Sequence, residues 1–102
     1  MYGYTMRVAQ DIETYHALHR AVLGLVGYDY EGLVLHFAAP TPQGFELTEV
    51  WDSKDRLEAF NREVLPAAVH AAGVTLDPAE VQVTEFSPTV VITPQSYSSD
   101  DR

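Results

Sequence analysis

Histidine is the residue type in this sequence best suited to acid–base chemistry, and no cysteine accompanies it. The absence of Cys removes disulfides, thiolate nucleophiles and cysteine-ligated metal centres as explanations. His36 stands in the apolar run from Leu33 to Ala38, which we predict to be a strand. A strand holds an imidazole rigidly, and the ordinary histidine pKa suits proton transfer near neutral pH. His36 is therefore the first candidate for a catalytic acid or base, and a packed, hydrogen-bonded histidine is the alternative.

A second histidine lies on the apolar side of a predicted helix that begins after Asp11. On a helical wheel, His19 falls between Tyr15 and Val22, within the buried stripe. A histidine on a buried helix face needs a hydrogen-bond partner or a cavity. We predict that Tyr15 and His19 line a ligand pocket, where His19 would stabilise developing negative charge.

Arg7 is the third candidate for a catalytic role. It alternates with bulky apolar residues along a predicted strand over residues 2–9. Two interpretations stay open, because the register between strands is not visible in the sequence. Arg7 either pairs with Glu46 on the neighbouring strand or anchors an anion or enolate beside His36.

Three aromatic side chains are candidates for the walls of a flat pocket. Trp51 ends a predicted strand immediately before a helix cap, where it either closes the core or forms one end of the pocket. Tyr4 and Phe60 are the other two. A cavity of about 300 Å³ or more, faced by His36 or His19, would favour a ligand site over a packed core.

The elements that must position these residues follow from hydrophobic periodicity. Alternating or apolar runs bounded by turn residues predict four strands, over residues 2–9, 33–38, 45–51 and 81–86. Helical spacing predicts one helix from Ile12 that Gly24 and Gly27 end. It predicts a second from a cap at Asp52 or Ser53 to Gly73, which Pro66 kinks or divides.

Two connecting segments complete the pattern. Pro40, Pro42 and Gly44 predict a hairpin connection of about six residues. Residues 89–93 form a β-rich extension that could cross to a partner chain. Residues 1–93 are predicted to form one domain, and residues 94–102 a flexible C-terminal tail.

The order β-α-β-β-α-β predicts an α+β, ferredoxin-like fold with a four-stranded antiparallel sheet in the order 4-1-3-2. Right-handed crossovers place both helices on one face of that sheet. The other face also carries apolar residues, which predicts that a second copy of the chain covers it. We therefore expect a homodimer, in which the spare segment 89–93 could pair with the partner.

With these elements placed, the chain resembles the dimeric α/β-barrel superfamily over roughly residues 2–86. Within it, the chain is similar to small proteins related to antibiotic biosynthesis monooxygenases. The residues that carry the resemblance are Gly32–His36, Pro42–Gly44, Glu49–Ser53, Phe60, Leu65, Pro66 and Gly73. The resemblance implies a pocket position for His36 and a reaction without a metal or organic cofactor, either oxygenation or cyclisation.

Haem binding is a further option that the resemblance raises. In haem-degrading members, a helix histidine ligates iron about ten residues after an aromatic, and Phe60 and His70 share that spacing. The aromatic here is Phe rather than Trp, the first strand has no Asn, and Pro66 intervenes. These departures place haem binding behind the cofactor-free reactions.

Charge and composition narrow the partners. The formal net charge is −9, and only six residues are Lys or Arg, so binding to nucleic acid or an anionic membrane is not expected. No apolar run reaches the ~18 residues that span a bilayer, and the N-terminus lacks a secretion signal. The sequence thus predicts a cytoplasmic protein without a metal site.

The functional hypothesis is a homodimer that binds one small apolar, aromatic or polyketide-like molecule per subunit. As an enzyme, it would be a cofactor-independent monooxygenase or cyclase with His36 as base. The alternative is a non-catalytic ligand-binding or assembly module of the same fold, in which the histidines are only packed.

Overall fold

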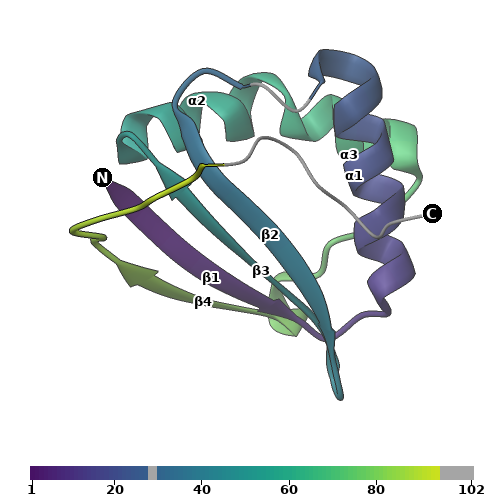
Figure 1. The fold of residues 1–102 in the computed structure, drawn as a ribbon. Coiled ribbons are helices and arrows are strands. Elements are labelled where there is room, and N and C mark those ends of the chain that lie inside the picture. Colours follow the sequence, from purple (N-terminus) through teal and green to yellow (C-terminus); the bar gives the residue numbers. More distant parts are fainter. Residues whose placement is uncertain (28–29, 95–102) are drawn as a thin grey trace.

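A computed structural model describes residues 1–27 and 30–94, and the predicted tail over 94–102 lies outside the described residues except for Pro94. One antiparallel sheet carries the helices on one of its faces (Figure 1). Its strands are β1 (Tyr2–Val8), β2 (Leu33–Thr41), β3 (Gly44–Trp51) and β4 (Val81–Phe86), in the order β2-β3-β1-β4. The helices are α1 (Ile12–Val26), α2 (Lys54–Glu63), α3 (Leu65–Ala72) and the short 3₁₀ helix η1 (Pro78–Glu80). This confirms the predicted ferredoxin-like α+β fold.

The core forms where the alternating faces of β1 and β3 meet the helices. Val8, Phe45 and Leu47 are buried together, and Met6 and Ile12 pack against them. Successive side chains of a strand point to opposite faces, so the predicted alternation already identified the helix-facing side. Hydrophobic burial on this side stabilises the sheet–helix contact.

Helix boundaries follow local capping chemistry with one difference from prediction. The Asp11 carboxylate accepts a hydrogen bond from the Glu13 amide at 2.9 Å, which caps α1 as expected. Gly24 does not end α1, which continues to Val26 and stops before Gly27 at φ 75°. A glycine inside a helix costs only about 1 kcal/mol, which is too little to end a helix by itself.

The second helical region is divided, which was one of two predicted outcomes. Ser53 caps α2 by accepting from the Arg56 amide at 3.3 Å. Val64 separates α2 from α3, and Pro66 occupies the first turn of α3, where no amide donor is required. Gly73 then ends α3 in the left-handed conformation, with φ 68°.

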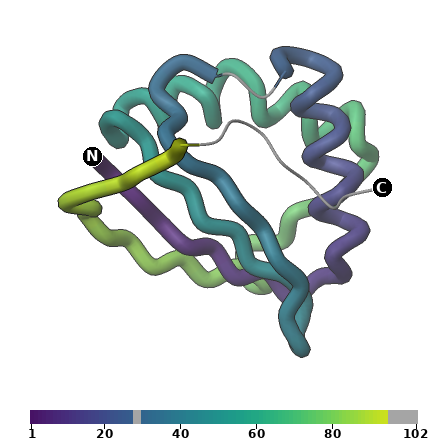
Figure 2. The backbone as a smooth tube through the Cα atoms, viewed as in Figure 1, coloured from purple at the N-terminus to yellow at the C-terminus, as the bar shows by residue number. Residues whose placement is uncertain are grey.

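The hairpin between β2 and β3 is tighter than predicted. Both strands extend until Thr41 pairs with Gly44, so Pro42 and Gln43 alone form the connection (Figure 2). The expectation of about six residues was wrong because Pro40 is part of β2. A proline is tolerated there because β2 is an edge strand of the sheet.

The predicted β-rich extension forms no strand in the single chain. Residues 87–94 carry neither helix nor strand, and Ile92 is 81% exposed. Pro88 and Pro94 bracket the segment and remove two backbone donors, which opposes pairing with the free edge of β4. In the described ranges, no helix has the length and apolar character required to cross a membrane.

Gly44 offers a direct test of how closely the hairpin packs against the backbone at Val8. A β-carbon at Gly44 would lie 2.1 Å from the Val8 carbonyl oxygen, and backbone atoms cannot yield to it. We expect Gly44→Ala to lower the free energy of unfolding by about 2–4 kcal/mol in urea titrations. The control is Gly24→Ala, which meets open space within α1 and should raise it by about 0.5–1 kcal/mol. Equal stability of Gly44→Ala and the wild type would contradict this close packing.

Candidate functional site

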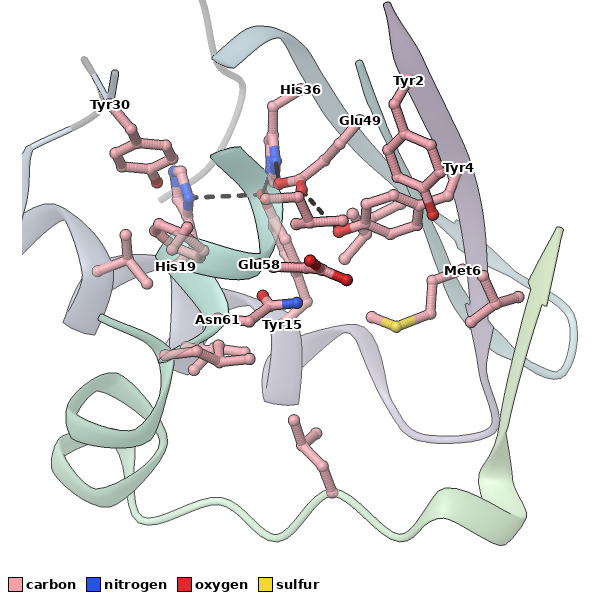
Figure 3. Close-up of a pocket in the computed structure, with 18 of the residues that line it drawn as sticks. Tyr2, Tyr4, Met6, Tyr15, His19, Tyr30, His36, Glu49, Glu58 and Asn61 are labelled. Atoms are coloured by element: carbon pink, nitrogen blue, oxygen red, sulfur yellow. Dashed lines mark hydrogen bonds and ion pairs between the residues drawn. The ribbon is translucent and has the colours of Figure 1, made fainter. Parts of the chain in front are cut away.

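A cavity of about 440 Å³ lies between the sheet and the helices (Figure 3). Its walls are mostly apolar and include Met6 from β1, Leu18 from α1, Leu57 from α2 and Val83 from β4. The volume exceeds the roughly 300 Å³ at which ligand pockets begin. His36 and His19 both line it, an arrangement that favours a ligand site over a packed core.

Glu49 is the polar centre of this cavity wall. It occupies the helix-facing side of β3 beside Leu47 and Trp51, and only 6% of its surface is exposed. Strand pairing sets Tyr4 of β1 and His36 of β2 directly opposite it, on its two sides. A buried carboxylate is costly unless donors surround it, so these neighbours determine its state.

Three side chains satisfy the Glu49 carboxylate. Its Oε1 accepts from Tyr4 Oη at 2.6 Å and from Trp51 Nε1 at 2.9 Å. Its Oε2 lies 2.6 Å from His36 Nδ1. Burial alone would raise the pKa of Glu49, but the hydrogen bond and charge of His36, aided by Tyr4 and Trp51, hold that pKa below its ordinary value. Glu49 is therefore ionised at neutral pH.

The hydrogen bonds continue from His36 to α1. A carboxylate accepts only, so Glu49 holds a proton on His36 Nδ1. Nε2 is an acceptor in the neutral imidazole and a donor in the imidazolium. Tyr15 Oη lies 2.6 Å from that Nε2 and donates to it when the ring is neutral. The same oxygen is 3.4 Å from His19 Nδ1. We call Glu49, His36, Tyr15 and His19 the polar chain.

Ring stacking fixes the end of the polar chain formed by His36, Tyr15 and His19. The Tyr15 and His19 rings are 5.4 Å apart at 14°, and the His19 and His36 rings are 6.0 Å apart at 12°. Tyr15 also packs on Phe45, with ring centroids 5.8 Å apart. These contacts restrict rotation of the phenol, so its oxygen is held at one position beside the cavity.

A charged group occupies the side of the cavity near β4 and α2. Tyr2 Oη donates to Glu85 Oε2 at 2.7 Å, and Lys54 Nζ lies 3.4 Å from that oxygen. Burial and then the hydrogen bond to Glu85 raise the pKa of Tyr2 to about 12. Tyr2 therefore remains a neutral phenol near neutral pH.

The structure brings five of the predicted site residues to the cavity. Two predicted residues lie elsewhere. Trp51 is fully buried and does not line the cavity, which corresponds to the core-closing alternative. Arg7 faces the other side of the sheet, with Nε 3.3 Å from Glu46 Oε2, which corresponds to the ion-pair alternative. The predicted residues that line the cavity are His36, His19, Tyr15, Tyr4 and Phe60.

The geometry does not favour haem binding through His70. His70 is exposed on α3 and is not part of the cavity wall. Across residues 1–27 and 30–94, no group of three or more His, Cys, Asp or Glu side chains is arranged to hold a metal ion.

Sequence reasoning missed the role of Glu49, and a bulge in β2 explains why. Leu33 pairs with Trp51, and an uninterrupted antiparallel register would then place His36 opposite Thr48. The register shifts by one residue between Leu33 and Leu35, so His36 pairs with Glu49 instead. Because neighbours across a sheet share a face, the shift turns His36 toward the helices. An acidic residue within the apolar Phe45–Trp51 face was the available signal.

Comparison with known proteins supports the fold. The chain matches no known family profile and no curated protein. It is similar to the structure of NE2512, a protein of unknown function from Nitrosomonas europaea, with a TM-score of 0.62, 14% identity, and coverage of 93% of this chain and 95% of that one.

Two further structures share the arrangement. One is a Deinococcus radiodurans protein described as a candidate antibiotic biosynthesis monooxygenase, at TM-score 0.56 and 17% identity, covering 94% of this chain and all of that one. The other is SnoaB, a cofactor-independent oxygenase from Streptomyces nogalater, at TM-score 0.54 and 12% identity, covering 92% and 95%. The likeness is one of fold. At that level, the resemblance predicted from the sequence is confirmed.

Glu49→Gln tests the ionised state of the buried carboxylate. A neutral amide cannot satisfy three donors, so we expect the variant to lose about 1–3 kcal/mol of stability at pH 7. The unfolded carboxyl takes up a proton near its ordinary value of 4.5, whereas the folded one does so only at lower pH. The free energy of unfolding of the wild type should therefore decrease as the pH is lowered below 4.5. The difference in this free energy between wild type and variant should shrink over the same range.

Urea titrations between pH 7 and about pH 3 measure this difference. The matched control is Glu46→Gln on the outer face of β3, which should cost less than about 1 kcal/mol because its ion pair with Arg7 is partly exposed. A Glu49→Gln difference that stays constant with pH would show that Glu49 is not an ionised partner of His36.

Proposed function

We propose that this protein binds a small, largely apolar aromatic compound in the cavity and transfers a proton to or from it. The observation that carries the proposal is the buried Glu49–His36 pair, which lies at the wall of a mostly apolar cavity. Ligand pockets characteristically combine apolar walls with a few convergent polar groups. A carboxylate that orients an imidazole and stabilises its protonated form is a recurring device in general base catalysis.

The reaction that fits is a cofactor-independent oxygenation or cyclisation. Both begin when a base removes a proton from an electron-rich phenol or enol. In the first, the resulting carbanion reacts with dioxygen, and in the second it attacks a carbonyl of the same molecule. The fold shared with SnoaB supports oxygenation by analogy only.

We further propose that the working form is a homodimer joined through the outer sheet face. This face carries Leu35, Phe37 and Phe86, of which Phe37 is 51% and Phe86 39% exposed. Contiguous exposed apolar residues are unfavourable on a solitary domain. A second sheet packed against this face would cover them.

A single charge on the outer face tests the dimer. We expect the wild type to have twice the chain mass by light scattering at micromolar concentration. Phe37→Asp should be a folded monomer, because an unpaired carboxylate opposes burial in an apolar interface. Leu25→Asp, on the exposed end of α1, should remain a dimer. A monomeric wild type would contradict the proposed homodimer.

Binding of β-tetralone, a neutral, flat bicyclic ketone, tests the cavity. We expect calorimetry or ligand-observed NMR to give a Kd below about 1 mM, which corresponds to about −4 kcal/mol. Met6→Trp should abolish binding because the larger ring fills the cavity from β1. Arg7→Gln, on the other face, should bind as the wild type does. Equal binding by all three proteins, or by none, would contradict the proposed pocket.

A further inference from the structure

Tyr4 of β1 points toward the buried carboxylate of Glu49 at the cavity wall (Figure 3). Its Oη donates to Glu49 Oε1 at 2.6 Å, and in the described part of the chain Glu49 is the one hydrogen-bond partner of that oxygen. Burial and then the charge of Glu49 raise the pKa of Tyr4, so the phenol keeps its proton at neutral pH. Because this proton is used in the bond to Glu49, the Tyr4 oxygen meets a bound compound as a hydrogen-bond acceptor.

Glu49 strengthens Tyr4 as an acceptor. A phenol that donates to a carboxylate carries more negative charge on its oxygen, so a second hydrogen bond to that oxygen gains strength. Glu49 is 6% exposed, and water therefore screens its charge only weakly. Tyr2 makes a similar bond to Glu85, but the side chain of Glu85 is 56% exposed. The same polarisation is therefore weaker at Tyr2 than at Tyr4.

The charges at the cavity oppose an anionic ligand. Glu58 and Glu85 line it as well as Glu49, and Lys54 is the one Lys or Arg side chain in the wall that residues 1–27 and 30–94 form. Lys54 Nζ is already engaged, 3.4 Å from Glu85 Oε2. A carboxylate or phenolate in the cavity would lose its hydration and meet like charges, which makes its burial costly. A neutral compound meets no such cost.

We infer that the compound in the cavity is neutral and carries a hydroxyl that donates a hydrogen bond to Tyr4 Oη, which makes Tyr4 a specificity-determining residue. This inference rests on the proposed function and names the ligand class of the same cavity. The hydroxyl keeps its proton, because the charge of Glu49 behind Tyr4 disfavours a negative oxygen there. It orients the aromatic body between the apolar walls, and the proton transfer of the proposed function takes place at another position of the compound.

A double-mutant cycle between the ligand hydroxyl and the Tyr4 hydroxyl tests this contact. The probes are 2-naphthol and 2-methylnaphthalene, which share a flat bicyclic body and differ by a hydroxyl in place of a methyl group. Fluorescence titration of the naphthalene ring gives the Kd of each probe for the wild type and for Tyr4→Phe.

We expect the ratio of the two Kd values to favour 2-naphthol about fivefold to tenfold more in the wild type than in Tyr4→Phe, which is the effect of one hydrogen bond. Arg7→Gln, on the outer face of the sheet, should keep the wild-type ratio. The same ratio in the wild type and in Tyr4→Phe would overturn the assignment of Tyr4.

A second readout uses the wild type alone, because Tyr4→Phe leaves Glu49 with one donor fewer and is less stable. With ¹³C-labelled tyrosine, the Cζ resonance of Tyr4 should shift further with 2-naphthol than with 2-methylnaphthalene, whereas the Cζ resonance of Tyr2 should respond alike to both. Equal shifts of Tyr4 with the two probes would overturn the hydroxyl contact. A hydroxyl-specific shift at Tyr2 alone would place the contact beside β4 and would also overturn the role of Tyr4.

The anion 2-naphthoate tests the exclusion of charged ligands. At pH 7 its carboxyl is ionised and 2-naphthol is neutral. The wild type should bind 2-naphthoate at least tenfold more weakly than 2-naphthol. Equal or tighter binding of 2-naphthoate would overturn the neutral ligand class.

The outcomes distinguish this inference from the function on which it rests. If 2-naphthol, 2-methylnaphthalene and β-tetralone bind and Tyr4→Phe does not change their ratio, the inference fails and the pocket stands. If none of the three binds to the wild type, the proposed pocket is contradicted, and this inference fails with it.

Discussion

The buried carboxylate of Glu49 is the constraint on which the rest of this structure depends. An ionised group with 6% exposure is tolerated only because three donors reach it. Tyr4 comes from β1, His36 from β2 and Trp51 from β3 itself, so the need for compensation ties three adjacent strands to one register. The same interactions that offset the cost of burying the Glu49 carboxylate also hold the His36 imidazole beside the cavity.

The bulge in β2 converts this constraint into a functional arrangement. Without the shift between Leu33 and Leu35, His36 would face away from the helices and Glu49 would lose its hydrogen-bond partner on β2. With it, the imidazole reaches Tyr15 on α1, and the stacked rings of Tyr15, His19 and His36 join sheet to helix. Polar interactions thus cross the contact between the sheet and α1, which otherwise consists of apolar packing. Such a buried polar network is expected where a core has been adapted to bind or react.

Much of the fold could be predicted because it depends on local pattern. The alternation around Phe45, the cap at Asp11 and the stop at Gly73 each have a short-range physical cause. The site was only partly predictable. His36 and His19 were visible as polar residues in apolar surroundings, but their partners depend on register. The bulge and the two-residue hairpin at Pro42 are set by pairing between strands, which a single sequence does not encode in its periodicity.

The tautomer of His36 is the most direct test of this account. Long-range ¹H–¹⁵N correlation spectra of the neutral ring should show a proton on Nδ1, shifted downfield by its short bond to Glu49, and an unprotonated Nε2. That pattern would establish the carboxylate as acceptor and Tyr15 as donor. A proton on Nε2, or averaged signals from rapid exchange between the two tautomers, would show that Glu49 does not fix the ring. The assignment of donors and acceptors along the polar chain would then be wrong.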